Sequence, residues 1–254
     1  MIENLGVQLF TLRNEMVDES SVAQAFKKIK EIGYDHIQPA NFCGLAVERF
    51  ADLARETGLT ASKCGTIATW TRILDEPDVV LAEHAAVGAT NIGIGWMPPE
   101  WRDCPESLSN FIEKANEFNR YAVKNGFTVG YHNHSFEFTK LGGERIIDRL
   151  INELDENINF ILDTYWIQHG GGDVCVWIEK LADRIEVLHL KDMEMEEKQQ
   201  LFCEVGNGNM NFDGIMKVAD KAGIKTYVVE QDICKGDPFD SIKMSYDFIT
   251  NNYK

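Results

Sequence analysis

The chain has 254 residues, of which 44% are hydrophobic and 26% are charged, and this composition excludes a disordered or fibrous protein. A net charge of -16 repels the phosphates of nucleic acids and anionic membranes, and the lysines and arginines form no basic stripe. We therefore expect a small-molecule ligand, with neither nucleic acid nor membrane as a partner.

The six cysteines are far apart and include no C-x-x-C pair, so we expect reduced thiols in a cytoplasmic protein and no disulfide framework or zinc ribbon. No apolar run is long enough to span a bilayer. The N-terminus lacks a basic region followed by an apolar core, so no secretion signal is expected.

Strand-like and helix-like segments alternate along the whole chain. The buried run 5–10 predicts a strand, and the apolar spacing from Val22 to Ile32 predicts an amphipathic helix that ends at Gly33. The same unit then recurs. Further strands are expected at 36–40, 60–64, 91–95, the beginning of 128–137, 158–163, 185–191 and 226–232. Further helices are expected at 45–57, 78–87, 105–125, 144–154, 174–182, 212–222 and 239–250.

The eight expected strands are apolar on both faces and are joined by helices, which is typical of a parallel sheet covered by helices. Eight such units close most naturally into one barrel. No Pro/Ser-rich linker interrupts the series. The sequence therefore predicts an α/β protein with a single (β/α)8 TIM-barrel domain over residues 1–254.

Polar metal-binding side chains follow the apolar runs of four consecutive expected strands. They are Glu137, Asp163, His189 and Glu230, each about one strand-helix unit from the next. The carboxyl ends of barrel strands meet on one face, so these side chains should be neighbours. Three facing carboxylates would repel one another, and a divalent metal relieves that repulsion while accepting the imidazole as a further ligand.

Each member of this set also has a purely structural explanation. Asp163 can cap a helix, His189 can be an interior hydrogen-bonded histidine, and Glu230 can pair with a lysine. The four together favour a metal site. Oxygen-rich ligation with one histidine suits Mn²⁺, Mg²⁺ or Co²⁺ better than a structural zinc, and Zn²⁺ is a further alternative.

The motifs at these strand ends resemble the xylose isomerase-like TIM-barrel superfamily, specifically the bacterial sugar phosphate isomerase/epimerase group. The similarity covers nearly the whole chain and lies in the stretches 131–138, 162–166, 187–192, 204–208 and 228–232. The resemblance implies one divalent ion, commonly manganese, held by Glu137, Asp163, His189 and Glu230. It also implies that Glu137 and Glu230 exchange a proton beside a substrate carbonyl, and it allows a homodimer because barrels of this group often pair.

The fifth strand departs from the pattern of many relatives, which have a glutamate followed by Asn-His where this chain has His132-Asn133-His134. Strand alternation puts His132 and His134 on one face, so either can reach the centre. We favour Glu137 as the ligand, with both histidines contacting the substrate. The alternative is that His132 takes the ligand position and the proton-transfer scheme loses one glutamate.

Three further residues are candidates for contacts with the substrate. Lys191 lies two residues after His189 and should share its face, where it could stabilise an oxyanion or simply pair with an aspartate. Gln8 and Trp166 are candidate sugar contacts. The Gly206-Asn207-Gly208 turn has no basic cluster beside it, so we do not predict a phosphorylated substrate from it.

The leading hypothesis is a metal-dependent sugar isomerase or epimerase of carbohydrate metabolism that removes a proton alpha to a carbonyl and forms an enediolate. The alternative is a metal-dependent lyase or dehydratase of keto-sugars, keto-glycosides or keto-inositols. An endonuclease IV-like phosphodiesterase is disfavoured, because six histidines and an acidic chain supply neither a multi-metal cluster nor a DNA-binding surface. A non-catalytic sugar-binding barrel is the remaining alternative.

Overall fold

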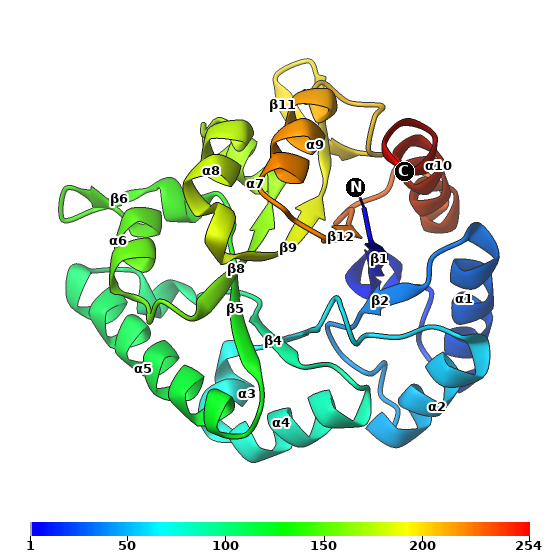
Figure 1. Cartoon of the computed structure of the whole chain (residues 1–254), viewed down its shortest axis with the longest axis horizontal. Coiled ribbons are helices and arrows are strands. Elements are labelled where there is room, and N and C mark those ends of the chain that lie inside the picture. The colour runs from blue at the N-terminus through cyan, green and yellow to red at the C-terminus, as the bar shows by residue number, and fades with distance from the viewer. Residues whose placement is uncertain (1) are drawn as a thin grey trace.

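A computed structural model describes residues 2–254, in which eight parallel strands form one sheet with the order β2-β1-β12-β9-β8-β5-β4-β3. The strands curl into a barrel that helices surround (Figure 1). Their bounds are β1 Asn4–Gln8, β2 His36–Gln38, β3 Thr66–Ala68, β4 Asn91–Ile94, β5 Thr128–His132, β8 Ile158–Asp163, β9 Ile185–Leu190 and β12 Thr226–Val229. The predicted (β/α)8 architecture is confirmed.

The α-helices lie on the outside of this barrel (Figure 1). Sequence signals define several of them; α1, for example, begins with a capping box between Asp18 and Ser21 and ends at Gly33, which has a φ of 122°. The bounds are α1 Glu19–Ile32, α2 Val47–Thr57, α3 Trp70–Asp75, α4 Pro77–Ala86, α5 Pro105–Lys124, α6 Ile146–Glu153, α7 Thr164–His169, α8 Val174–Leu181, α9 Phe212–Lys221 and α10 Pro238–Tyr253.

The barrel has a seam between β2 and β3, which are the two ends of the hydrogen-bonded strand order. Across this seam, Thr60 forms an isolated bridge with His36, and the Ile67 N–H donates to the Pro39 carbonyl at 2.8 Å. The side chain of Gln38 also crosses it and donates to the Cys64 carbonyl at 2.6 Å. The barrel is therefore nearly closed, with fewer ladder hydrogen bonds at the seam than elsewhere.

A small hydrophobic cluster fills the barrel interior and consists of Cys64, Ile161, Val187 and Val228, with Ile67 packed against them. Glycines on the facing strands make room for these side chains. A Cβ on Gly6 would lie 2.5 Å from the Cys64 sulfur, and a Cβ on Gly93 would lie 2.7 Å from Ile161 Cδ1. Large side chains on some strands thus face glycines on others, which produces a packed interior without a pore.

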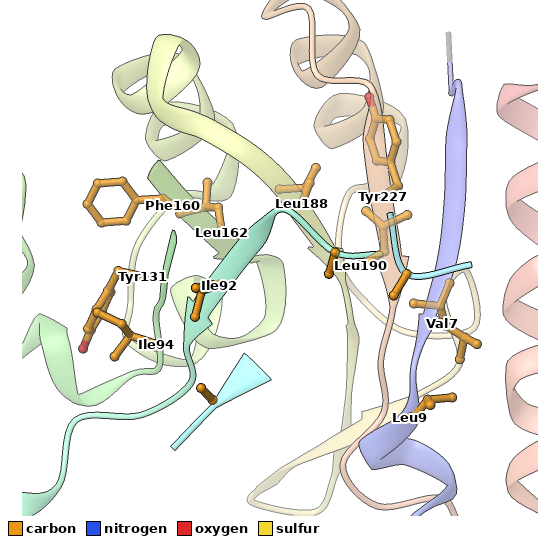
Figure 2. Packing of buried hydrophobic residues seen from close by; sticks show 14 of the residues in the cluster. Val7, Leu9, Ile92, Ile94, Tyr131, Phe160, Leu162, Leu188, Leu190 and Tyr227 are labelled. Atoms are coloured by element: carbon orange, nitrogen blue, oxygen red, sulfur yellow. The ribbon is translucent and has the colours of Figure 1, made fainter. Parts of the chain in front are cut away.

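The larger hydrophobic core lies between the barrel and the helices. Figure 2 shows its members on neighbouring strands, including Ile92, Tyr131, Phe160 and Leu188. Alternate residues of a strand point to opposite faces, so the residues between these core positions face the barrel interior. This alternation decides which residues at the strand ends face the centre.

The structure differs from the sequence prediction in the third strand and in several short elements. The strand expected at 60–64 is wrong, because residues 62–64 form a turn before Gly65, which has a φ of 70°, and β3 begins only at Thr66. The short helices α3 and α7 were not predicted. Neither were two hairpins, β6 Lys140–Leu141 with β7 Glu144–Arg145, and β10 Asp192–Glu196 with β11 Gln199–Cys203.

No helix within residues 2–254 combines the length and the hydropathy that crossing a bilayer requires.

Candidate functional site

Four buried side chains with metal-binding atoms meet at the carboxyl end of the barrel. His132 ends β5, Asp163 ends β8, His189 lies near the end of β9, and Glu230 directly follows β12. One donor atom from each lies within 4.8 Å of all the others. Each of the four comes two residues after an interior position, namely Gly130, Ile161, Val187 and Val228. Strand alternation therefore places them one layer above the hydrophobic interior.

The donor atoms lie close together, but they do not satisfy all of one another's hydrogen-bonding capacity. Asp163 Oδ2 is 3.4 Å from His132 Nε2 and 3.8 Å from His189 Nδ1, and Glu230 Oε2 is 3.0 Å from His189 Nδ1. Within the described chain, His132 Nε2 is buried and has no hydrogen-bond partner, and Asp163 Oδ2, also buried, has the Lys191 ammonium as its ion-pair partner at 3.1 Å. Buried polar atoms without partners are costly and require an explanation.

Neighbouring groups orient two of these side chains. The Trp166 N–H donates to Asp163 Oδ1 at 2.9 Å, and this bond leaves Oδ2 turned toward the cluster. His189 Nε2 lies 2.7 Å from Gln38 Oε1, which also accepts from Gln8 Nε2. Because an amide oxygen only accepts, Nε2 carries a proton toward Gln38; Nδ1 lies 3.0 Å from Glu230 Oε2, which also only accepts, so without a metal this nitrogen carries the second proton of an imidazolium. With Nε2 engaged by Gln38, Nδ1 is the ring nitrogen that a metal would take in place of that proton.

Lys191 lies at the edge of the cluster and is completely buried. Its Nζ lies 2.9 Å from Glu230 Oε2, 3.1 Å from Asp163 Oδ2 and 3.2 Å from Asp232 Oδ2. Burial opposes the charge on Lys191, yet Asp163 and Glu230 raise its pKa above the ordinary value. In return, Lys191 overcomes the effect of burial and lowers the pKa of both carboxyl groups.

The titration of the remaining groups follows from burial and neighbouring charge. Burial lowers the pKa of His132 and His134, so both imidazoles are neutral at pH 7. For His189, burial acts in the same direction, but Asp163 and Glu230 raise its pKa overall. Burial and the charge on Glu230 raise the pKa of Asp232 to about 6, although Lys191 opposes the change.

The donor set fits a divalent metal. Two imidazoles and two carboxylates converge from four adjacent strands, and the unpartnered His132 Nε2 is a ready ligand atom. Asp163 and Glu230 carry two negative charges, whereas within residues 2–254 the only ammonium in contact with them is that of Lys191. These residues can therefore hold a divalent metal ion.

Glu137, which we expected among the ligands, does not lie in the cluster. It belongs to the 3-10 helix η3 Phe136–Phe138, beyond the end of β5, and it is fully buried. Its Oε1 accepts from the Tyr131 hydroxyl and its Oε2 from the His134 N–H, both at 2.8 Å. Both carboxylate oxygens are thus engaged away from the centre. The geometry favours the alternative in which His132 takes the ligand position.

The predicted substrate-contacting residues line one cavity of about 700 Å³ above the cluster. His134, Gln8 and Trp166 all contribute to its wall, together with His132 and Lys191. The ring of His134 stacks on Phe136 at 5.4 Å, and within residues 2–254 its buried Nδ1 has no partner. Apart from Glu137, the predicted site residues therefore line this cavity or, in the case of Asp163, belong to the cluster at its base.

Sequence reasoning did not single out two residues that touch this site, Gln38 and Asp232. Gln38 links His189 to Gln8, and Asp232 pairs with Lys191. Both positions could have been found by alternation. Gln38 is the last residue of β2, and Asp232 lies two residues after Glu230.

The glycine turn at 206–208 does not form an anion cradle. The N–H groups of Gly206 and Gly208 donate to Asp192 Oδ2 at 2.9 and 3.1 Å, so this carboxylate already engages them.

Comparison with known proteins identifies the family. A family model described as xylose isomerase-like TIM barrel matches residues 26–250. An inosose dehydratase from Erwinia tasmaniensis is 26% identical over 150 residues, which cover 51% of this chain and 50% of that protein. The chain thus aligns with about half the length of this relative.

Solved structures share the whole fold. A sugar phosphate isomerase/epimerase from Parabacteroides distasonis has a TM-score of 0.82 at 20% identity, covering 100% of this chain and 96% of that one. A xylose isomerase-like TIM barrel protein from Mycobacterium smegmatis, in complex with magnesium, has a TM-score of 0.72 at 17% identity, covering 98% and 95%. The match over residues 26–250 means that the chain belongs to the xylose isomerase-like TIM barrel family.

Proposed function

We propose that this protein is a metal-dependent lyase of the dehydratase type that acts on ketones derived from sugars or cyclic polyols. The observation that carries the proposal is that the cluster contains one glutamate, Glu230, while Glu137 is bound to Tyr131 and the His134 N–H. Epimerisation by two glutamates on opposite faces needs both at the substrate. Elimination needs only one positioned base.

We propose His132, Asp163, His189 and Glu230 as the metal ligands. Two imidazole nitrogens and two carboxylate oxygens suit Mn²⁺, Co²⁺ or Zn²⁺ better than Mg²⁺, which prefers oxygen. When bound, the divalent ion polarises the substrate carbonyl and acidifies the adjacent C–H bond.

The chain's own residues then move the protons. Glu230 accepts the proton from the carbon beside the carbonyl, and the Lys191 ammonium, 2.9 Å from Glu230, donates to the oxygen on which negative charge develops. The C–O bond at the next carbon breaks as the C=C bond forms and the carbonyl is restored, and the proton that Glu230 accepted passes to the departing hydroxide, so that water leaves and the Glu230 carboxylate is regenerated. His134, Gln8 and Trp166 orient the substrate within the cavity.

An isomerase or epimerase is the second candidate, because the same proton abstraction begins both reactions. The likeness to the Parabacteroides distasonis isomerase/epimerase supports the fold that this reaction uses, whereas the dehydratase relative supports elimination. The two proposals share the metal ligands and differ in the fate of the enediolate. In both, the protein is a cytoplasmic enzyme.

The experiment incubates metal-loaded protein in D2O with a panel of ketoses, an inosose and 3-keto-glycosides. Metal content is measured by mass spectrometry, solvent deuterium in recovered substrate by NMR, and unsaturated product by its ultraviolet absorbance. We expect unsaturated product from at least one compound, and loss of turnover in Glu230→Gln with folding retained. Glu186→Gln is the matched control, because Glu186 lies at the opposite end of β9 and bonds Asn91 and Asn159.

Three outcomes discriminate among the hypotheses. Unsaturated product supports the lyase. Deuterium exchange or an epimer without elimination overturns the lyase in favour of the second candidate. A folded, metal-loaded wild type that neither exchanges nor eliminates with any compound overturns both proposals and favours a binding protein.

A further inference from the structure

The wall of the cavity combines two kinds of side chain. The cluster contributes polar groups, including His189, Lys191 and Glu230. The loops that follow β1 and β4 contribute two large aromatic rings, those of Phe10 and Trp96. At about 700 Å³, the whole cavity lies within the range of about 300–1,000 Å³ that is typical for drug-sized ligands, which are larger than a monosaccharide.

Phe10 and Trp96 are unusually exposed for large aromatic side chains, with 39% and 45% of their surfaces accessible. Among the described residues, the only other exposed large aromatic is Tyr121, whose hydroxyl bonds to Asp78 and which lies outside this cavity. Exposed apolar surface that gathers in one concave region indicates a binding site. The two exposed aromatic rings without a hydroxyl group, Phe10 and Trp96, therefore both belong to the cavity.

An arginine that does not line the cavity lies beside each ring. The Arg13 guanidinium lies 4.1 Å from the Phe10 ring centroid, and its Nη1 donates to the Phe10 carbonyl at 2.8 Å. The Arg102 guanidinium lies 5.7 Å from the Trp96 ring centroid, and its Nε donates to the Met97 carbonyl at 3.0 Å. Neither arginine lines the cavity, so both rings keep surface free for a ligand.

We propose that Phe10 and Trp96 form a second ring-binding subsite, and that the preferred substrate is a keto-sugar carrying a second ring on a glycosidic oxygen. The first ring binds over the cluster through polar groups, and the second lies against the aromatic surfaces. The apolar faces of a sugar ring and of an aromatic ring both suit such surfaces. This inference rests on the proposed function for the first ring and adds the class of substrate.

Binding measurements test the subsite without requiring turnover. Calorimetric titrations of the metal-loaded protein use glucose, methyl β-glucoside, phenyl β-glucoside and cellobiose, which lack the ketone and cannot react by this chemistry. The variants are Phe10→Ala, Trp96→Ala and, as a matched control for an exposed aromatic outside the cavity, Tyr121→Ala. Parallel kinetics compare 3-keto-glucose with the 3-keto forms of the two-ring compounds.

We expect at least one two-ring ligand to bind about tenfold more tightly than methyl glucoside, a factor that corresponds to one aromatic contact. Phe10→Ala and Trp96→Ala should each remove most of this preference, and Tyr121→Ala should leave it intact. Preference for the phenyl compound alone assigns an aromatic second ring, and preference for cellobiose assigns a sugar.

Equal affinity for methyl glucoside and both two-ring ligands overturns the subsite, as does a preference that survives both cavity variants. Turnover of 3-keto-glucose together with equal affinities leaves the proposed function standing without the subsite. A two-ring preference in a protein that turns over no keto compound leaves the subsite standing without the proposed function. The two failures are therefore distinguishable.

Discussion

Replacing Glu137 by glutamine should make the protein's stability less dependent on pH. Burial raises the pKa of this carboxyl group from 4.5 to about 7, even though the Tyr131 hydroxyl and the His134 N–H favour its charged form. A folded-state pKa above the unfolded value means that the folded protein binds the extra proton. The stabilisation is thus full below pH 4.5 and is lost as the pH rises through 7.

The magnitude follows from the size of the shift. A difference of about 2.5 pKa units corresponds to about 3 kcal/mol, of which about 2.5 kcal/mol is lost between pH 5 and pH 8. In Glu137→Gln, the amide oxygen can still accept from the His134 N–H and the amide nitrogen can donate to the Tyr131 oxygen. The variant therefore keeps the contacts and loses the titration.

The assay is equilibrium urea unfolding in EDTA at several pH values between 5 and 8, followed by circular dichroism. The free energy of unfolding of wild type minus that of Glu137→Gln should fall by about 2.5 kcal/mol across this range. Glu48→Gln, at an exposed position on α2, controls for the change in net charge. A difference that does not vary with pH would refute the assignment of the buried carboxyl.

Three further predictions concern the cluster and the loop beside it. Lys191→Met leaves Asp163 and Glu230 without their ammonium partner, so urea unfolding should show that the free energy of unfolding of the metal-free protein falls by about 3–5 kcal/mol. Calorimetry should show that the variant binds Mn²⁺ more tightly than wild type, and an unchanged affinity would contradict the charge argument. Chelation should lower the Tm of metal-loaded wild type, because a ligand at a hundred times its Kd stabilises the folded state by about 2.7 kcal/mol. A Tm that changes neither with EDTA nor with added Mn²⁺ would contradict the proposed metal site. Asp192→Ala removes the acceptor for the Gly206 N–H and should lower the free energy of unfolding by about 1–3 kcal/mol. Limited proteolysis should cleave the variant faster after residue 192, and an unaltered cleavage pattern would contradict this prediction.

The repeat of strand and helix was readable from the sequence because its signals are local. The apolar run of β8 and the glycine that ends α1 are examples, and they fall where expected. The third strand was misplaced because residues 60–64 and β3 are both short and suited to extended structure. The turn at Gly65 separates the two segments. A Cβ at this position would lie 2.7 Å from the Asn91 carbonyl oxygen, and because this close approach involves a residue distant in sequence, local sequence signals do not reveal it.

The candidate site was predictable to the extent that strand alternation decides it. Asp163, His189 and Glu230 were found because each ends an apolar run and faces inward. Glu137 was preferred over His132 because the family resemblance implies a glutamate at this position. The strand ends at His132, and the following 3-10 helix turns Glu137 toward Tyr131. The register of the strand therefore brings His132 to the cluster, although the resemblance favoured Glu137.

The seam between β2 and β3 has fewer ladder hydrogen bonds than the strands that carry the cluster. The four cluster residues come from β5, β8, β9 and the end of β12, which are neighbours in one hydrogen-bonded ladder. The wall of the cavity also includes Ile67 of β3 and Asn41 of the loop after β2, on the two sides of the seam. Hydrogen exchange should therefore be fastest at this edge, and its opening would admit a bulky substrate while the donor atoms keep their spacing.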